Sequence, residues 1–172
     1  INRLSPRDTA SVADTLYLIV ESAIKVVPEA SAVIYAYDPV QRAFDLDSRL
    51  SAGEPQGYVP QDDPRPDGIG TRAITQRRRV LSYAEPDLDI HPDKVRAGAR
   101  AMACFPLVVA YQPVGVLYVY LHQERRFSQS ELLMLEIFVN QAAMAIYQAR
   151  RLLSIQRDLA RREQEFNRLR RA

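Results

Sequence analysis

The segment from Glu131 to Ala172 contains neither glycine nor proline, the two residues that most often interrupt a helix. Ser128, followed three residues later by Glu131, forms a capping box of the kind found at helix N-termini. The segment is therefore predicted to be one helix, far longer than the roughly 12 residues of an average globular helix. At 172 residues the chain is expected to be one domain with this helix as an appendage.

The apolar residues of this helix follow two patterns. The first half has a stripe spaced by three and four that is expected to pack on a sheet: Leu132, Leu135, Val139, Ala142 and Ile146. Beyond Arg150 the spacing is that of heptad core positions, with Arg162 in one polar slot: Leu152, Ile155, Leu159, Phe166 and Leu169. The same register continues upstream through Met134, Phe138, Gln141, Ala145 and Gln148.

The second pattern predicts a parallel homodimer along the first and last helices, with Arg162 weakening the pairing locally so that the tail shifts easily. A tail that frays and becomes ordered only beside a following domain is the alternative. Eight arginines and three acids give the tail from Arg150 a net charge of +5, and the preceding residues carry −3. Asp158, Glu163 and Glu165 are interleaved with the arginines, as on a solvated coiled-coil face, so no nucleic-acid partner is expected.

The rest of the chain reads as a mixture of helices and short strands. Thr9 to Val27 has helical periodicity and is stopped by Pro28, whereas 53–70 and 85–92 have loop composition. Short helices are expected over 68–79 and 93–99, and strands over 31–37, 44–50, 80–83, 101–110 and 114–121. Strands outnumber crossovers, so we predict an α+β fold with an antiparallel sheet and helices on one face.

Six segments, in order, resemble a GAF domain, a sensory module with a PAS-related fold. They are GIGTRAIT (68–75), RVL (79–81), AMACFPL (101–107), PVGVLYV (113–119), FSQSELLML (127–135) and QAAMAI (141–146). The resemblance covers residues 9–152. It implies a lead-in at 1–8 from a preceding region, and a coiled-coil signalling helix at 153–172 leading to an output domain such as a histidine kinase.

In such a domain the ligand lies on the sheet face opposite the helices, under the loops. Alternation assigns Ala32, Ile34 and Ala36 to the helices, which leaves Tyr35 and Tyr37 toward the pocket. Met102 and Cys104, on the strand expected over 101–110, are also assigned to the pocket. Arg100, at the mouth of that strand, is a candidate for neutralising an anionic ligand. Asp87 and His91, from the second loop, complete the expected site.

None of the cofactors that GAF domains bind is expected in this chain. Cys104, the only thiol, is followed by Phe105 rather than the histidine common in bilin-binding relatives, so we expect a buried apolar residue and no covalent bilin. One thiol also cannot form the disulfide of the sulfoxide-reductase members. His91 and His122 are too far apart in sequence for a histidine-rich metal site, no haem is expected, and the cyclic-nucleotide signature is missing.

The loop acids Asp62, Asp63, Asp67, Asp87, Asp89 and Asp93 are expected to be solvated. No apolar run reaches the roughly 18–20 residues of a membrane span, so a cytoplasmic location without membrane insertion is predicted. The predicted function is a non-catalytic regulatory domain that senses an unidentified small molecule. The alternatives are a structural dimerisation module without a ligand and a bilin-type photoreceptor.

Overall fold

The computed structural model describes the backbone of residues 6–171 and the side chains of residues 12–171. The elements are α1 (Pro6–Val26), β1 (Ala30–Asp38), β2 (Ala43–Ala52), α2 (Ile69–Gln76), β3 (Val80–Leu81), the 3₁₀ turn η1 (Ser82–Ala84), α3 (Pro92–Arg96), β4 (Ala101–Val109), β5 (Gln112–Leu121) and α4 (Gln129–Arg170). Of the expected lead-in 1–8, residues 1–5 lie outside the described range, and α1 already begins at Pro6.

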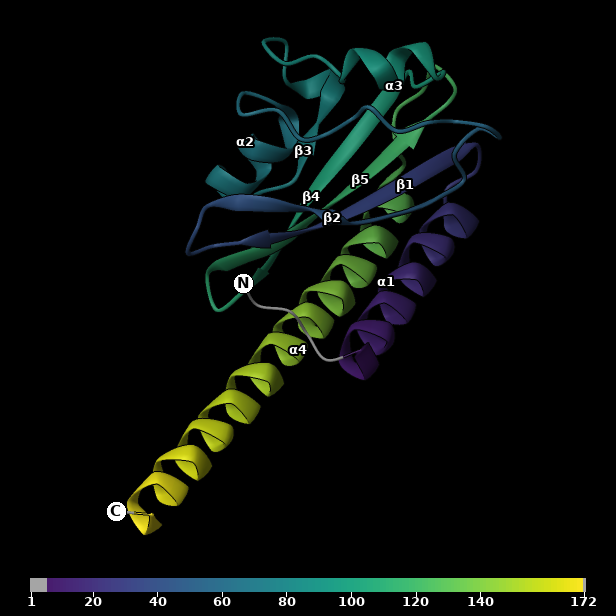
Figure 1. The fold of residues 1–172 in the computed structure, drawn as a ribbon. Helices are drawn as coiled ribbons and strands as arrows, with labels where there is room; N and C mark the ends of the chain where they lie inside the picture. The colour runs from purple at the N-terminus through teal and green to yellow at the C-terminus, as the bar shows by residue number, and fades with distance from the viewer. Residues whose placement is uncertain (1–5, 172) are drawn as a thin grey trace.

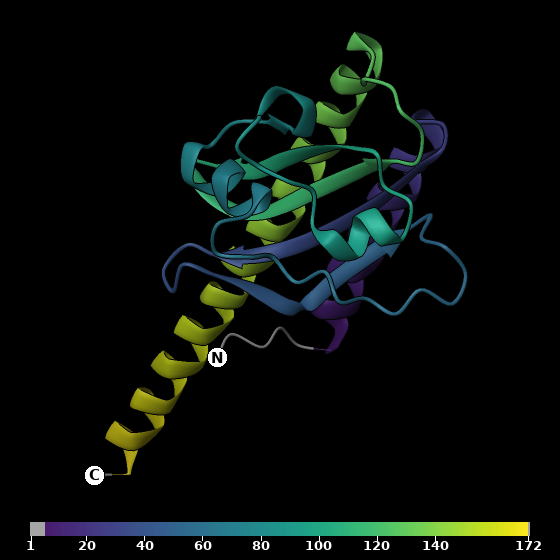
Figure 2. The same cartoon turned by 90° about the horizontal axis from the view of Figure 1, so that it is seen from above.

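The strands form one antiparallel sheet in the order β2-β1-β5-β4-β3. Helices α1 and α4 lie side by side across one face of this sheet, while α2, α3 and the long loops cover the other (Figures 1 and 2). The predicted α+β architecture is therefore confirmed.

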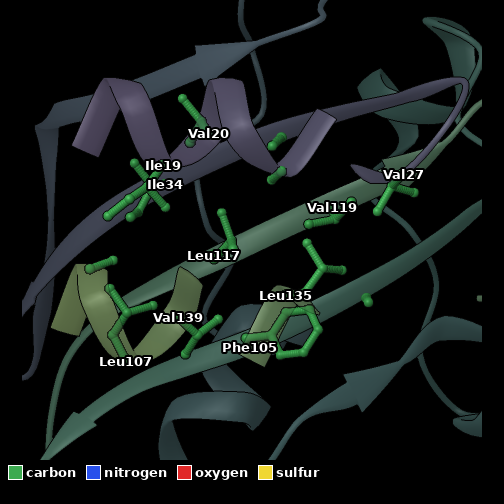
Figure 3. Close-up of a cluster of buried hydrophobic side chains, with 14 of the residues drawn as sticks. Ile19, Val20, Val27, Ile34, Phe105, Leu107, Leu117, Val119, Leu135 and Val139 are labelled. Carbon is green, nitrogen blue, oxygen red and sulfur yellow. The ribbon is translucent and has the colours of Figure 1, made fainter. Parts of the chain in front are cut away.

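The larger core lies between the sheet and these two helices. Ile19 and Val20 of α1 and Leu135 and Val139 of α4 point toward the sheet (Figure 3). The sheet residues that meet them come from alternate positions of three strands: Ala32, Ile34, Ala103, Phe105, Leu117 and Val119. Burial of these side chains, at about 25 cal/mol per Å² of apolar surface, fixes both helices to the sheet.

Helix α4 begins with the predicted capping box. The backbone N–H of Glu131 donates to Ser128 Oγ at 3.1 Å, and the carboxylate of Glu131 accepts from the Ser128 N–H at 2.8 Å. The apolar residues of this helix gather in its first half, and one 18-residue window of the helix is apolar enough to resemble a membrane span, with a mean hydropathy of 1.3. Leu132, Leu135 and Ile146 of that half are nevertheless buried in the core of this domain. From Ser154 to Arg171 every residue is exposed, and the helix leaves the body.

Two predicted boundaries are wrong for local reasons. The strand expected over 80–83 ends at Leu81, because Ser82 turns into η1 and its hydroxyl accepts the Met102 N–H at 2.9 Å. The helix expected to reach residue 79 ends at Gln76, since Arg77 adopts a left-handed conformation with φ +50°. Pro106 can lie within β4 because β3 pairs only with Ala103 and Cys104, so no strand on that side needs a hydrogen bond from residue 106.

Candidate functional site

The face of the sheet away from α1 and α4 carries a second, aromatic cluster. Three tyrosines form its centre, Tyr35 on β1 and Tyr118 and Tyr120 on β5. Tyr118 and Tyr120 are stacked with 6.0 Å between ring centroids, and Tyr35 meets Tyr118 edge-on at 6.3 Å. Residues of this face alternate with those of the helix-side core, as the sequence pattern predicted for β1 and β4.

A small cavity of about 20 Å³ lies above this aromatic face. Its floor is Met102, Tyr118 and Tyr120, and its walls come from the first loop, the start of α2 and the second loop: Asp62, Asp63, Pro64, Arg65, Gly68, Ile69, Gly70, Asp89 and His91. That volume is enough for about one water molecule. Gly70 is required here, because a Cβ at that position would lie 1.8 Å from the Tyr118 hydroxyl oxygen.

An ionic cluster of two buried and two half-buried side chains adjoins this cavity through Asp62. We call it the Lys94 cluster; it comprises Arg49, Glu54, Asp62 and Lys94. Lys94 Nζ lies 3.0 Å from Asp62 Oδ2 and 3.2 Å from Glu54 Oε1. Arg49 donates to Asp62 at 3.1 and 2.9 Å and also pairs with Glu54. The four formal charges cancel within the cluster.

Two tyrosine rings enclose the Lys94 ammonium group. Its Nζ lies 4.6 Å from the ring centroid of Tyr58 and 4.8 Å from that of Tyr120, both within cation–π range. The Tyr58 hydroxyl donates to Asp93, the neighbour of Lys94 in α3. The contacts thereby join β2, the first loop and α3 to the aromatic face of β5.

The contacts of the cluster keep the Asp62 carboxyl group ionised. Burial alone would raise the pKa of the Asp62 carboxyl group, but hydrogen bonds from Arg49 and the charge of Lys94 outweigh it and hold the pKa below its ordinary value. Asp62 is therefore an anion at neutral pH. Burial raises the pKa of Tyr118 and Tyr120 well above the usual range, so both phenols remain neutral.

A comparison of the sequence with models of protein families agrees with this arrangement of a loop-covered sheet face opposite two long helices. The model of the GAF domain family matches residues 9–146. The chain belongs to the GAF domain family.

Solved GAF domains have the same fold as this one. The GAF domain/HD domain protein from Geobacter sulfurreducens is 20% identical, with a TM-score of 0.64 over 82% of this chain and 95% of that one. The GAF domain of a two-component sensor histidine kinase from Bacillus halodurans is 15% identical, with a TM-score of 0.64 over 85% and 96%. A type II free methionine-R-sulfoxide reductase from Thermoplasma acidophilum is 12% identical, with a TM-score of 0.60 over 82% and 96%.

At these identities the similarity carries the fold and not the activity. The comparison with curated proteins gave no match.

The GAF domain brings only some of the candidate ligand residues to the cavity. His91 and Met102 line it. Tyr35 lies below it and donates a hydrogen bond of 3.4 Å to Asp62. Tyr37 contacts Phe44 edge-on and only borders the aromatic cluster. Cys104 is fully buried on the same face, where burial raises the pKa of its thiol well above the ordinary value.

Two candidates lie elsewhere on the GAF domain. Asp87 pairs with Arg72 at the surface, with 2.6 Å between Oδ2 and Nη2. Arg100 is exposed and donates to the backbone carbonyls of Val95 and Ala99 at 3.4 and 3.0 Å. Neither side chain is part of the cavity wall.

Sequence reasoning missed the Lys94 cluster. Asp62 was expected to be a solvated loop acid, but it is 7% exposed and paired with two cations. Lys94 is one of only two lysines in a chain that otherwise uses arginine, and this rarity was the one available signal. The compact ammonium group of a lysine fits between two rings, whereas the guanidinium group of an arginine is planar and larger.

A groove runs along the outer side of α1 and α4. It is lined by Val12, Thr15, Asn140, Gln141, Met144, Ala145, Gln148, Ala149 and Leu152. Gln141, Ala145, Gln148 and Leu152 are the residues that the heptad register placed in a dimer seam. Phe138, from the same register, is partly buried against the helix-side core. The seam residues on the protruding helix, Ile155, Leu159, Phe166 and Leu169, are 48–75% exposed.

Proposed function

We propose that this GAF domain is a regulatory module of a signalling protein. A small molecule bound above the aromatic face changes how the sheet packs against α1 and α4, and α4 passes the change to an output domain. The module itself is non-catalytic and cytoplasmic, binds no nucleic acid, does not insert into a membrane, and pairs with a second copy in parallel.

The observation that carries this proposal is that one strand contributes side chains both to the cavity side of the sheet and to the core under the helices. Along β5, Tyr118 and Tyr120 contact the cavity side, while Leu117 and Val119 contact the helices. A displacement of the tyrosines is therefore transmitted through one backbone to the helix-side core, whose close packing resists independent movement. Helix α4 then continues from that core into solvent.

The state of the single thiol supports a non-catalytic role. Cys104 is the only cysteine of the sequence and has a buried, protonated thiol, whereas thiol catalysis uses an accessible thiolate.

A specific observation favours the second candidate, a structural dimerisation module. The cavity holds about one water, so a metabolite can enter only if the first loop or α3 moves away from the tyrosines. If the Lys94 cluster never opens, the groove and the exposed stripe of α4 remain as surfaces of the described chain through which a second copy can bind.

Thermal unfolding with metabolite and nucleotide libraries distinguishes the two. A ligand at a hundred times its dissociation constant adds about 2.7 kcal/mol to the free energy of unfolding, which raises Tm by about 5–10 °C. Asp63→Ala at the cavity rim should change the shift, and Asp67→Ala, an exposed residue of the same loop outside the cavity wall, should leave it unchanged. The structural module would be favoured if neither the libraries nor cell extract changed Tm and if no bound molecule co-purified with the protein.

Sedimentation tests the dimer. The chain and a shorter chain ending at Leu153 should both be compared at tens of micromolar. We expect the full chain to be dimeric and the shorter one to associate more weakly, because it lacks the stripe on the protruding helix. A monomeric full chain would refute the homodimer, and equal association would place the interface in the groove alone.

A further inference from the structure

The protruding part of α4 exposes an apolar stripe that no other part of the described chain covers. Leu159, Phe166 and Leu169 are 60%, 61% and 75% exposed. Leu152 belongs both to this stripe and to the groove between α1 and α4, so the two surfaces are continuous. A second copy of the chain, aligned in parallel, is the partner that covers both at once. This step rests on the proposed homodimer.

The charges beside the stripe are placed for one particular alignment of two copies. With Leu152, Leu159 and Phe166 at heptad position a, Arg162 occupies a core d position, Asp158 the g position and Glu163 the e position. Positions g and e flank the core of a parallel pair and face each other across it. Asp158 therefore faces Glu163 of the partner subunit, which taken alone is a repulsive contact between like charges.

Arg162 resolves this repulsion. It follows Asp158 by four residues on the same helix, a spacing at which an acid and a base attract. Its long side chain leaves the core between the two carboxylates, where its five N–H donors can serve both. We propose that Arg162, Asp158 of the same helix and Glu163 of the partner subunit form a charged layer that fixes the register of two α4 helices.

Alternative alignments lose this compensation. Sliding one helix by a heptad places either Gln156 or Arg170 of the partner subunit beside Arg162, instead of Glu163. Either direction of sliding does both at once: one Arg162 then has no acid from the partner subunit, and the other lies beside a second cation. The in-register pair also brings the two Arg162 side chains to one layer, but there the four carboxylates of Asp158 and Glu163 in the two copies surround them. Within the same in-register pair, Glu165 at g faces Arg170 of the partner subunit at e, a pair of opposite charges. A charged core residue thus weakens the pair but permits one register.

Charge reversal tests the layer. In sedimentation equilibrium, Arg162→Glu should weaken self-association at least about tenfold, because six carboxylates then meet at one level. Arg161→Glu, the adjacent arginine at a solvent-facing position, should change it less than about threefold. The triple variant Arg162→Glu, Asp158→Arg and Glu163→Arg should return to within about threefold of the native chain. All four positions are exposed beyond the body, so circular dichroism and Tm should show an intact fold.

The outcomes separate the layer from the dimer itself. A monomeric native chain overturns the homodimer and the layer together. A dimeric native chain in which Arg162→Glu and Arg161→Glu behave alike overturns the layer and leaves the dimer standing. A triple variant that stays as weak as Arg162→Glu also overturns the layer, because the charges would then not be acting on one another.

Discussion

Replacing Lys94 by methionine tests whether the Lys94 cluster stabilises the packing of the first loop and α3 on the aromatic face. Methionine retains most of the apolar stem and removes the ammonium group that lies 3.0 Å from Asp62 and 3.2 Å from Glu54. Arg49 alone must then compensate two carboxylates in a site where Asp62 is 7% exposed. Removing one partner of a buried ion pair costs about 3–5 kcal/mol.

The magnitude should be visible in a domain of this size. For a chain of about 170 residues each kcal/mol moves Tm by about 2–4 °C, so Lys94→Met should lower Tm by roughly 10 °C. Urea unfolding followed by circular dichroism, at one fixed protomer concentration, measures the same loss as free energy. Arg96→Met is the matched control: it lies on the same short helix, its side chain is 70% exposed, and it should cost less than about 1 kcal/mol.

A double-mutant cycle checks the cause. Asp62→Asn removes the negative charge that Lys94→Met leaves uncompensated, so the double variant should be more stable than the sum of the single losses predicts. Additive losses, or a Lys94→Met cost as small as that of Arg96→Met, would show that the reasoning about buried charge is wrong.

Three further results are expected. Gly70→Ala should destabilise the domain by about 1–3 kcal/mol, because the new Cβ would lie 1.8 Å from the Tyr118 hydroxyl oxygen, and Tyr118→Phe should recover part of that loss. Burial and the charge of Lys94 lower the pKa of His122 below its ordinary value, so the unfolded chain binds a proton at this residue more readily than the folded chain does. The free energy of unfolding should therefore fall from pH 7 to pH 5, and it should fall less steeply in His122→Gln. Cys104 should react with a thiol reagent only after unfolding, and protein from bilin-producing cells should show no zinc-induced fluorescence on a denaturing gel.

The fold could be predicted because its signals are local. Ser128 and Glu131 mark a helix start within four residues of sequence. Small and branched residues alternate with tyrosines along β1, and this sorted Ile34 to the helices and Tyr35 to the opposite face. Such patterns repeat at the period of one helix turn or one strand pleat, so a single sequence is enough to read them.

The site could be predicted only in outline, because its contacts join distant residues. Arg49, Asp62 and Lys94 come from β2, a loop and α3, and no spacing along the chain reports that they meet. The placement of Arg100 depended on a side-chain rotation toward backbone carbonyls that strand alternation does not specify. Loop conformation therefore limited what could be foreseen about ligand recognition.

The length of α4 beyond the body has a mechanical consequence. From Ser154 to Arg170 the helix extends about 25 Å at 1.5 Å per residue, with no glycine or proline to act as a hinge. A tilt of about 5° where α4 rests on the sheet would carry the far end sideways by about 2 Å, whereas side chains close to the pivot would move by only a fraction of that. The domain is in this sense a lever with a short arm in the core and a long arm in solvent, and the largest motion belongs to whatever is attached farthest from the sheet.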